Sequence, residues 1–153
     1  MRLIDFIKDN YIVCGFDAAS RSEVIQVLAD TLSQRGLVGN REEVVDGLTL
    51  AEEFHTTVIG NGVAVPHATI QGVDETLLMV ATTRQPVEFG PAGQDLSTVF
   101  FVLLSPPGLG GEHVRILARI ARLASDPIAV ERLRTAESEE MLMLAVEAMD
   151  ARL

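Results

Sequence analysis

The run Val99-Phe-Phe-Val-Leu-Leu104, within the segment from Leu96 to Leu104, decides the architecture of this chain. Its residues do not alternate between apolar and polar, so it predicts a strand that is buried on both faces. A strand of this kind needs other elements packed above and below its sheet. The rest of the chain must therefore supply two covering layers.

Other strands are predicted on the N-terminal side of this run. Residues 56–59 and 63–65 are short β-type runs on either side of Gly60-Asn61-Gly62, and Asn-Gly is the strongest short signal for a hairpin. Residues 11–16 and 76–83 are also rich in β-forming side chains. We expect all of these segments to join one sheet.

Helices are predicted at both ends of the chain. A short helix is expected at residues 3–8. Each of the others has a capping residue at its start or apolar residues at helical spacing. They begin near Ser20, Asn40, Glu112, Asp126 and Ser138. Strands in the middle with helices at both ends predict an α/β protein, a three-layer α/β/α sandwich.

Size and composition limit the possible classes of protein. The 153 residues are 48% hydrophobic and contain no linker or repeat, which predicts one domain over residues 1–153. No apolar run is long enough for a membrane span, so direct membrane insertion is not expected. The single cysteine, Cys14, fits a reducing compartment and predicts a cytoplasmic location.

The charge argues against nucleic acid as a partner. Twelve basic and 22 acidic residues leave a formal net charge of −10. Nucleic-acid binding depends largely on neutralising phosphates, so such a chain predicts no nucleic-acid interface. An acidic surface instead favours encounter with a basic protein partner.

His67 is the first candidate for chemistry. It follows Pro66 at the end of the second hairpin strand, and the proline fixes its own φ and biases Val65 toward extended geometry. We expect the imidazole to leave the sheet on a stiff stem, which suits a nucleophile that must be held in place. An ordinary loop histidine is the alternative.

His113 is the second candidate. At about 100° per residue, it lies on the apolar side of its helix, opposite Arg115, Arg119 and Arg122, which predict a solvated stripe. It occupies the first turn, where free amides and the helix dipole favour an anion. A hydrogen-bonded core histidine is the alternative. His55 is predicted to be a cap or surface residue.

Other polar groups carry less signal. The adjacent pairs Glu52-Glu53 and Glu139-Glu140 are predicted to lie on solvated helix faces. Zinc needs three or four ligands, and neither Cys14 nor the histidines have a recognisable ligand spacing. The sequence therefore predicts no metal site and no cofactor, although a metal protein using His67 and His113 stays open as a third hypothesis.

Two segments carry a resemblance to a known family. Thr57-Val-Ile-Gly-Asn-Gly-Val-Ala-Val-Pro-His67 resembles the active-site segment of the fructose/mannitol- and nitrogen-type IIA domains of the bacterial phosphoenolpyruvate-dependent sugar phosphotransferase system. Glu112-His113-Val-Arg-Ile-Leu-Ala-Arg-Ile-Ala-Arg-Leu123 is similar to the family's second histidine helix. The likeness includes Pro86-Val-Glu-Phe89 and covers almost the whole chain. It implies an α/β/α sandwich with a mixed sheet.

This resemblance implies a phosphocarrier. In the family, a histidine accepts a phosphoryl group from phosphohistidine on the carrier protein HPr. Sugar-type members then pass it to a cysteine of a IIB domain, whereas nitrogen-type members regulate other proteins. By motif position, His67 is the expected phosphoacceptor and His113 the neighbour that stabilises the phosphorylated state. The expected support of the phosphate site is Thr57, Asn61, Gly62 and Pro66.

The chain departs from the family pattern at two places. Ala51 stands where the family usually has an arginine near the phosphohistidine, and Ala68-Thr69 follow the active histidine where glycine is usual. Arg84 is a candidate to replace the missing charge. The departure at Ala51 keeps a second hypothesis open: a IIA-like regulatory binding module that is not phosphorylated.

Overall fold

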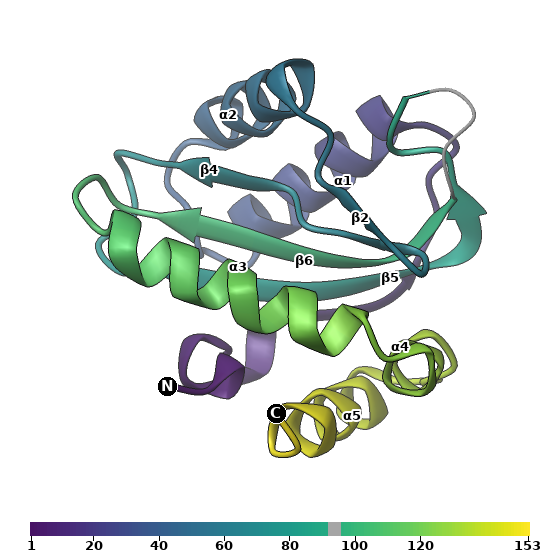
Figure 1. The fold of residues 1–153 in the computed structure, drawn as a ribbon. Helices are drawn as coiled ribbons and strands as arrows, with labels where there is room; N and C mark the ends of the chain where they lie inside the picture. The colour runs from purple at the N-terminus through teal and green to yellow at the C-terminus, as the bar shows by residue number, and fades with distance from the viewer. Residues whose placement is uncertain (92–95) are drawn as a thin grey trace.

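A computed structural model describes residues 1–91 and 96–153 of the chain, and Figure 1 shows its fold. Two 3₁₀ turns precede the first strand, and helices and strands then follow in an α/β order. In chain order the elements are η1 Leu3–Phe6, η2 Asp9–Tyr11, β1 Ile12–Phe16, α1 Arg21–Gln34, α2 Arg41–Phe54, β2 Val58–Gly60, β3 Val63–Ala64, β4 His67–Thr69, β5 Leu77–Val87, β6 Ser97–Ser105, α3 Gly110–Ala124, α4 Pro127–Arg134 and α5 Glu139–Asp150.

The strands form one mixed sheet. Its order is β1-β5-β6-β3-β2, and β4 pairs with the C-terminal half of β6, beyond the end of β3. The pairs β1–β5, β3–β6 and β4–β6 are parallel, whereas β5–β6 and β2–β3 are antiparallel. The mixed sheet implied by the resemblance is confirmed.

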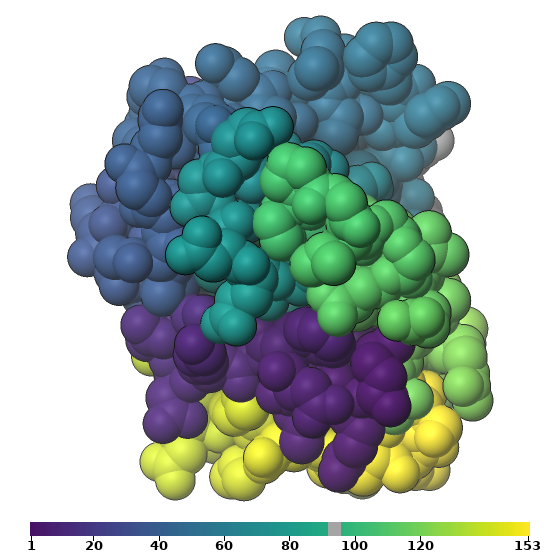
Figure 2. All heavy atoms as spheres, turned by 90° about the vertical axis from the view of Figure 1, so that its left-hand side faces the viewer, coloured from purple at the N-terminus to yellow at the C-terminus, as the bar shows by residue number. Residues whose placement is uncertain are grey.

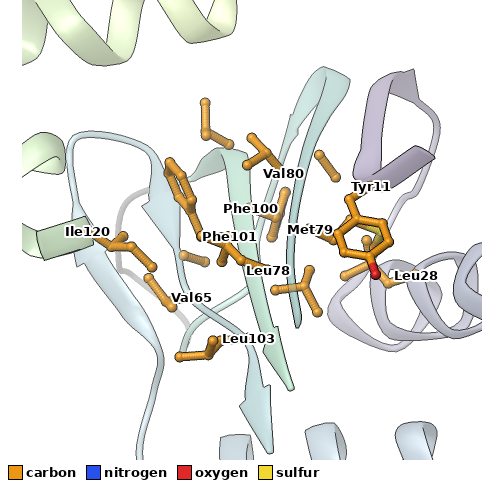
Figure 3. Close-up of a cluster of buried hydrophobic side chains, with 14 of the residues drawn as sticks. Tyr11, Leu28, Val65, Leu78, Met79, Val80, Phe100, Phe101, Leu103 and Ile120 are labelled. Atoms are coloured by element: carbon orange, nitrogen blue, oxygen red, sulfur yellow. The ribbon is translucent and has the colours of Figure 1, made fainter. Parts of the chain in front are cut away.

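Helices cover both faces of this sheet. Figure 1 shows α1 and α2 on one face and α3, α4 and α5 on the other, with the N-terminal turns beside α3 and α5. Every residue of β6 is buried, as its apolar sequence predicts. Figure 3 shows the packing: Leu28 of α1 lies on one side of the sheet, and Ile120 of α3 and Val65 lie together on the other. The three-layer α/β/α prediction is confirmed.

The start signals of the helices are also confirmed. Ser20, Asn40 and Ser138 each accept a hydrogen bond from the backbone N–H three residues later, and Asp126 accepts one from the N–H of Ile128. Because each cap satisfies an amide that has no partner inside the helix, these polar residues define where the chain turns into a helix.

The hairpin between β2 and β3 forms where Asn-Gly predicts it. Asn61 has a φ of 54° and Gly62 a φ of 79°, so two consecutive residues adopt the left-handed conformation that this turn requires. The Asn61 side chain also donates a hydrogen bond to the carbonyl of Ala124 at 2.8 Å. That contact fixes the turn to the C-terminal end of α3.

Several local predictions were wrong. The helix expected at residues 3–8 is a single 3₁₀ turn over Leu3–Phe6, since the segment is too short to sustain an α-helix. Arg119 does not belong to a solvated stripe: its Nε donates to the carboxylate of Asp150, which has no exposed side-chain surface. The described part of the chain contains no helix with the length and apolarity to cross a bilayer.

Candidate functional site

His67 lies in the sheet rather than in a loop beyond it. It opens β4, where it pairs with Leu103 of β6, so the prediction that it leaves the sheet was wrong. A strand of three residues has too little alternation to be recognised in a sequence. The next residue, Ala68, faces α2, because a Cβ built on Gly47 would lie 3.0 Å from the Ala68 Cβ. Side chains alternate along a strand, so His67 points to the opposite face, towards α3.

The backbone before His67 fixes the orientation of its ring. Nδ1 lies 2.7 Å from the carbonyl oxygen of Val65. A carbonyl only accepts hydrogen bonds, so this contact requires the hydrogen on Nδ1. In the neutral imidazole the lone pair is then on Nε2. Pro66 has a fixed φ and restricts the backbone of Val65, so it limits the chain that closes this contact, and the ring presents Nε2 as its reactive nitrogen.

His113 stands beside His67. The two ring centroids are 5.3 Å apart and the rings meet edge to face at 67°. Nδ1 of His113 lies 2.8 Å from Oγ of Ser105, the last residue of β6. Burial, and secondarily the charge of His67, lowers the pKa of His113, so the ring is mainly neutral at pH 7. A hydroxyl can donate or accept, and where Ser105 donates to Nδ1 the hydrogen of His113 is on Nε2.

The start of α3 adds donors to this site. The first bond of the helix runs from the His113 N–H to the Leu109 carbonyl, so the amides of Gly110, Gly111 and Glu112 have no partner within the helix. A pocket of about 310 Å³ opens here, lined by Ser105, His113, Leu109 and Val114 among others. Figure 2 shows this side of the molecule, where the start of α3 (green) meets the segment after β4 (teal).

The pocket and His67 share one face of the sheet. Thr69 lines the pocket and lies two residues beyond His67 on β4, so their side chains project in the same direction. The combination of an unprotonated imidazole nitrogen, a neighbouring imidazole and unpaired amides at a helix start suits a group that carries negative charge. Chemically, the arrangement can place a nucleophile against an anion.

Glu52 is a residue that the sequence analysis placed incorrectly. It was predicted on a solvated face, yet it is only 6% exposed. Its carboxylate accepts hydrogen bonds from both the N–H and the hydroxyl of Thr57. Burial raises its pKa, while these bonds and the charges of Arg21 and His67 oppose the rise. The predictions for Glu139 and Glu140, which are exposed, and for the surface cap His55 are confirmed.

The residues expected to support a phosphate site fall into two groups. Pro66 adjoins His67, and the Thr57 carbonyl accepts the Val65 N–H at 2.9 Å, so both lie close to the imidazole. Asn61 and Gly62 form the hairpin turn at the other end of α3. Ala124, which Asn61 contacts, is eleven residues from His113, or about 16 Å along a helix. The structure therefore does not bring these two residues to the histidine pair.

Arg84 does not supply a positive charge to the histidines. Its guanidinium pairs with Asp17 at 3.6 Å, and its side chain is 70% exposed. Along β5 it lies six residues from Leu78, the residue opposite Leu103, which is roughly 20 Å of strand. The methyl side chain of Ala51 carries no charge either. None of the ion pairs formed by residues 1–91 and 96–153 includes His67 or His113.

The geometry offers little to a metal ion. Within the described ranges, no group of three or more His, Cys, Asp or Glu side chains is placed to hold one. His67 and His113 alone would supply two ligands, fewer than the three that a catalytic zinc site takes from a protein.

Known proteins are similar to this chain over most of its length. The family model described as "Phosphoenolpyruvate-dependent sugar phosphotransferase system, EIIA 2" matches residues 5–148. A nitrogen regulatory protein of Bradyrhizobium diazoefficiens is 29% identical over 143 residues, which are 93% of this chain and 92% of that protein. The mannitol-specific phosphotransferase enzyme IIA component of Bacillus subtilis is 32% identical over 128 residues, with 82% and 85% covered.

Solved structures show the same fold. The nitrogen regulatory protein IIA-Ntr from Neisseria meningitidis superposes with a TM-score of 0.84 at 26% identity, over 93% of this chain and 97% of that one. The mannitol IIA of Escherichia coli, in its complex with phosphorylated IIB, superposes with a TM-score of 0.77 at 22% identity, over 93% and 99%. At that identity the second comparison establishes the fold alone.

Proposed function

Since this chain belongs to the EIIA type 2 family of the phosphoenolpyruvate-dependent sugar phosphotransferase system, we propose that its phosphoryl group is carried on Nε2 of His67. The observation that carries this proposal is the 2.7 Å contact between Nδ1 of His67 and the Val65 carbonyl. It leaves Nε2 as the nitrogen with a free lone pair, next to His113.

The transfer step follows from this tautomer. The lone pair of His67 Nε2 attacks the phosphorus of a phosphohistidine on the donor protein. The nitrogen–phosphorus bond of the donor breaks, and its electron pair returns to the donor ring nitrogen. The hydrogen stays on His67 Nδ1, hydrogen-bonded to the Val65 carbonyl, throughout the step. Because little covalent chemistry is required of the protein, catalysis consists of positioning and charge stabilisation.

Stabilisation of the transferred group falls to His113 and the start of α3. We assign the Ser105 hydroxyl as the donor to Nδ1, so that His113 presents an Nε2–H, which is a suitable donor to a phosphoryl oxygen. The free amides at the start of α3 and the helix dipole favour the same negative charge. These groups take the place of the arginine that the family usually has at the position of Ala51.

The donor and the acceptor are proteins. A phosphohistidine carrier such as HPr is the proposed donor, and the charge of −10 favours encounter with a basic surface. The Escherichia coli mannitol IIA is described in a complex with phosphorylated IIB, and the relatives include both mannitol-specific and nitrogen regulatory proteins. A IIB cysteine or a regulated protein is therefore the proposed recipient.

Intact mass spectrometry tests this function. The wild-type chain and His67→Gln are incubated with phosphoenolpyruvate, enzyme I and HPr, and HPr itself serves as the positive control. We expect one acid-labile phosphoryl mass on the wild-type chain and none on His67→Gln. A cognate HPr that becomes phosphorylated while the folded wild-type chain stays unmodified contradicts the proposal and supports the non-phosphorylated binding module instead.

A further inference from the structure

Glu52 is a buried carboxylate that the transfer step above does not use. It lies in the last turn of α2, is 6% exposed, and accepts two hydrogen bonds from Thr57. An acidic group at this depth is costly when ionised unless its charge is compensated. Both of these hydrogen bonds come from one neutral residue, so the groups in direct contact with the carboxylate carry no positive charge.

A continuous path of hydrogen bonds connects this carboxylate to His67. Thr57 donates its N–H and hydroxyl to Glu52, and its own carbonyl accepts the Val65 N–H at 2.9 Å. The Val65 carbonyl in turn accepts the His67 Nδ1–H at 2.7 Å. Glu52 therefore helps to position the backbone that selects the tautomer of His67.

The charges around Glu52 are few. Arg21, at the start of α1, and His67, at the start of β4, are the charged side chains that act on the carboxyl group, and both lower its pKa. Burial acts in the opposite direction and dominates. On its own segment, Glu53 and His55 are exposed to solvent, where their charges are screened.

Phosphorylation places negative charge at His67. A phosphoryl group adds negative charge and three acceptor oxygens to the imidazole. An ionised Glu52 on the same hydrogen-bonded path would then oppose the product. Like charges disfavour ionisation, so a proton bound by the carboxyl group would remove this conflict.

Resting on the proposed function, we propose that Glu52 takes up a proton when His67 is phosphorylated, and so makes the phosphorylation equilibrium of this protein depend on pH. The step balances as follows. The phosphoryl group moves from the donor nitrogen to His67 Nε2, and one proton from solvent converts the Glu52 carboxylate to a carboxylic acid. The neutral carboxyl keeps an oxygen that accepts from Thr57. At higher pH the proton is less available and the phosphorylated state is disfavoured.

Carbon-13 NMR of the glutamate carboxyl groups tests this directly in the wild-type chain. The titration midpoint of Glu52 is measured before and after phosphorylation. We expect it to rise by about one pH unit, which is a tenfold change in proton affinity. By linkage, the contribution of Glu52 to the change in the phosphorylation equilibrium between low and high pH is the same factor. His113 also gains proton affinity beside the phosphoryl group, but its imidazole signals are separate.

A matched pair of variants checks the equilibrium itself. Glu52→Gln keeps an acceptor for Thr57 but cannot take up the proton, while Glu53→Gln makes the same change at an exposed neighbour. Above the Glu52 midpoint, we expect Glu52→Gln to be phosphorylated by the donor with an equilibrium constant several-fold higher than the wild type and less dependent on pH. Glu53→Gln should follow the wild type.

The outcomes separate the two proposals. A phosphorylated wild-type chain in which Glu52 titrates at an unchanged pH overturns the role of Glu52 and leaves the carrier function standing. An equilibrium in Glu52→Gln that matches the wild type at every pH does the same. A wild-type chain that no donor phosphorylates overturns the carrier function, and the role of Glu52 with it.

Discussion

Replacing Asp150 with alanine should destabilise the fold more than any surface change. The Asp150 side chain has no exposed surface and accepts hydrogen bonds from Arg119 Nε at 2.6 Å and from the Ile4 N–H at 3.2 Å. It joins the end of α5 to α3 and to the N-terminal turn. In Asp150→Ala the Arg119 guanidinium, whose side chain is 16% exposed, loses the carboxylate, and the Ile4 amide loses its acceptor.

The expected cost follows from these contacts. Removing one partner of a buried ion pair costs about 3–5 kcal/mol, because the other charge stays buried without compensation. A domain of this size is stable by roughly 5–15 kcal/mol, so the variant loses a large part of its stability. At about 2–4 °C per kcal/mol, we expect the Tm to fall by roughly 6–20 °C.

Urea unfolding followed by circular dichroism measures this effect. The control is Glu131→Ala, which removes an exposed pair with Arg134 and should cost less than about 1 kcal/mol. The double variant Arg119→Met/Asp150→Leu should recover most of the loss, since it buries no unpaired charge. A loss in Asp150→Ala no larger than in Glu131→Ala would refute the view that this buried pair holds α3 and α5 together.

Three further results are expected. Ser105→Ala removes the hydrogen-bond partner of His113 Nδ1. The loss of about 1 kcal/mol should shorten the half-life of the phosphorylated protein roughly fivefold, as measured by ³¹P NMR. An unchanged half-life would show that the Ser105–His113 contact does not stabilise the phosphorylated protein. Gly62→Ala places a Cβ 3.4 Å from the Thr98 hydroxyl at a φ of 79°, and urea unfolding should show a loss of stability of about 1–3 kcal/mol. Gly36→Ala, at a φ of 73° with open space around it, should lose less. Equal losses in the two variants would contradict the role of the close contact. Burial lowers the pKa of His113 in the folded state, so the unfolded chain binds more protons below pH 6.5. The free energy of unfolding should therefore fall as the pH drops from 6.5 through the folded pKa. His113→Gln should flatten this pH dependence, and an unchanged slope would contradict the role of His113.

Local signals made most of the architecture predictable. Caps such as Ser20 and Asn40 act within four residues, and the Asn-Gly turn acts within a hairpin, so a sequence contains everything they need. The buried strand at residues 97–105 was equally evident because its apolar run is continuous. These elements together determine a sheet with helices on both faces.

The site was predictable only in part. His67 and His113 are prominent in the sequence, but the 5.3 Å separation of their ring centroids depends on the pairing of β4 with β6. A strand of three residues is too short to predict from the sequence. As one of two adjacent glutamates, Glu52 is predicted to lie on a solvated helix face, whereas in the structure the chain folds back and Thr57 donates two hydrogen bonds to its carboxylate. Its angle on the helix predicts Arg119 in a solvated stripe, and the local sequence does not reveal its partner Asp150, which lies 31 residues away in the chain.

The position of the phosphoryl group tests the central claim most directly. Long-range ¹H–¹⁵N NMR of the imidazoles, with ³¹P coupling in the phosphorylated chain, identifies the nitrogen that carries phosphorus. The tautomer fixed by Val65 predicts phosphorus on Nε2 of His67, with the Nδ1 hydrogen retained. Phosphorus on Nδ1 of His67, or on His113, would contradict the account.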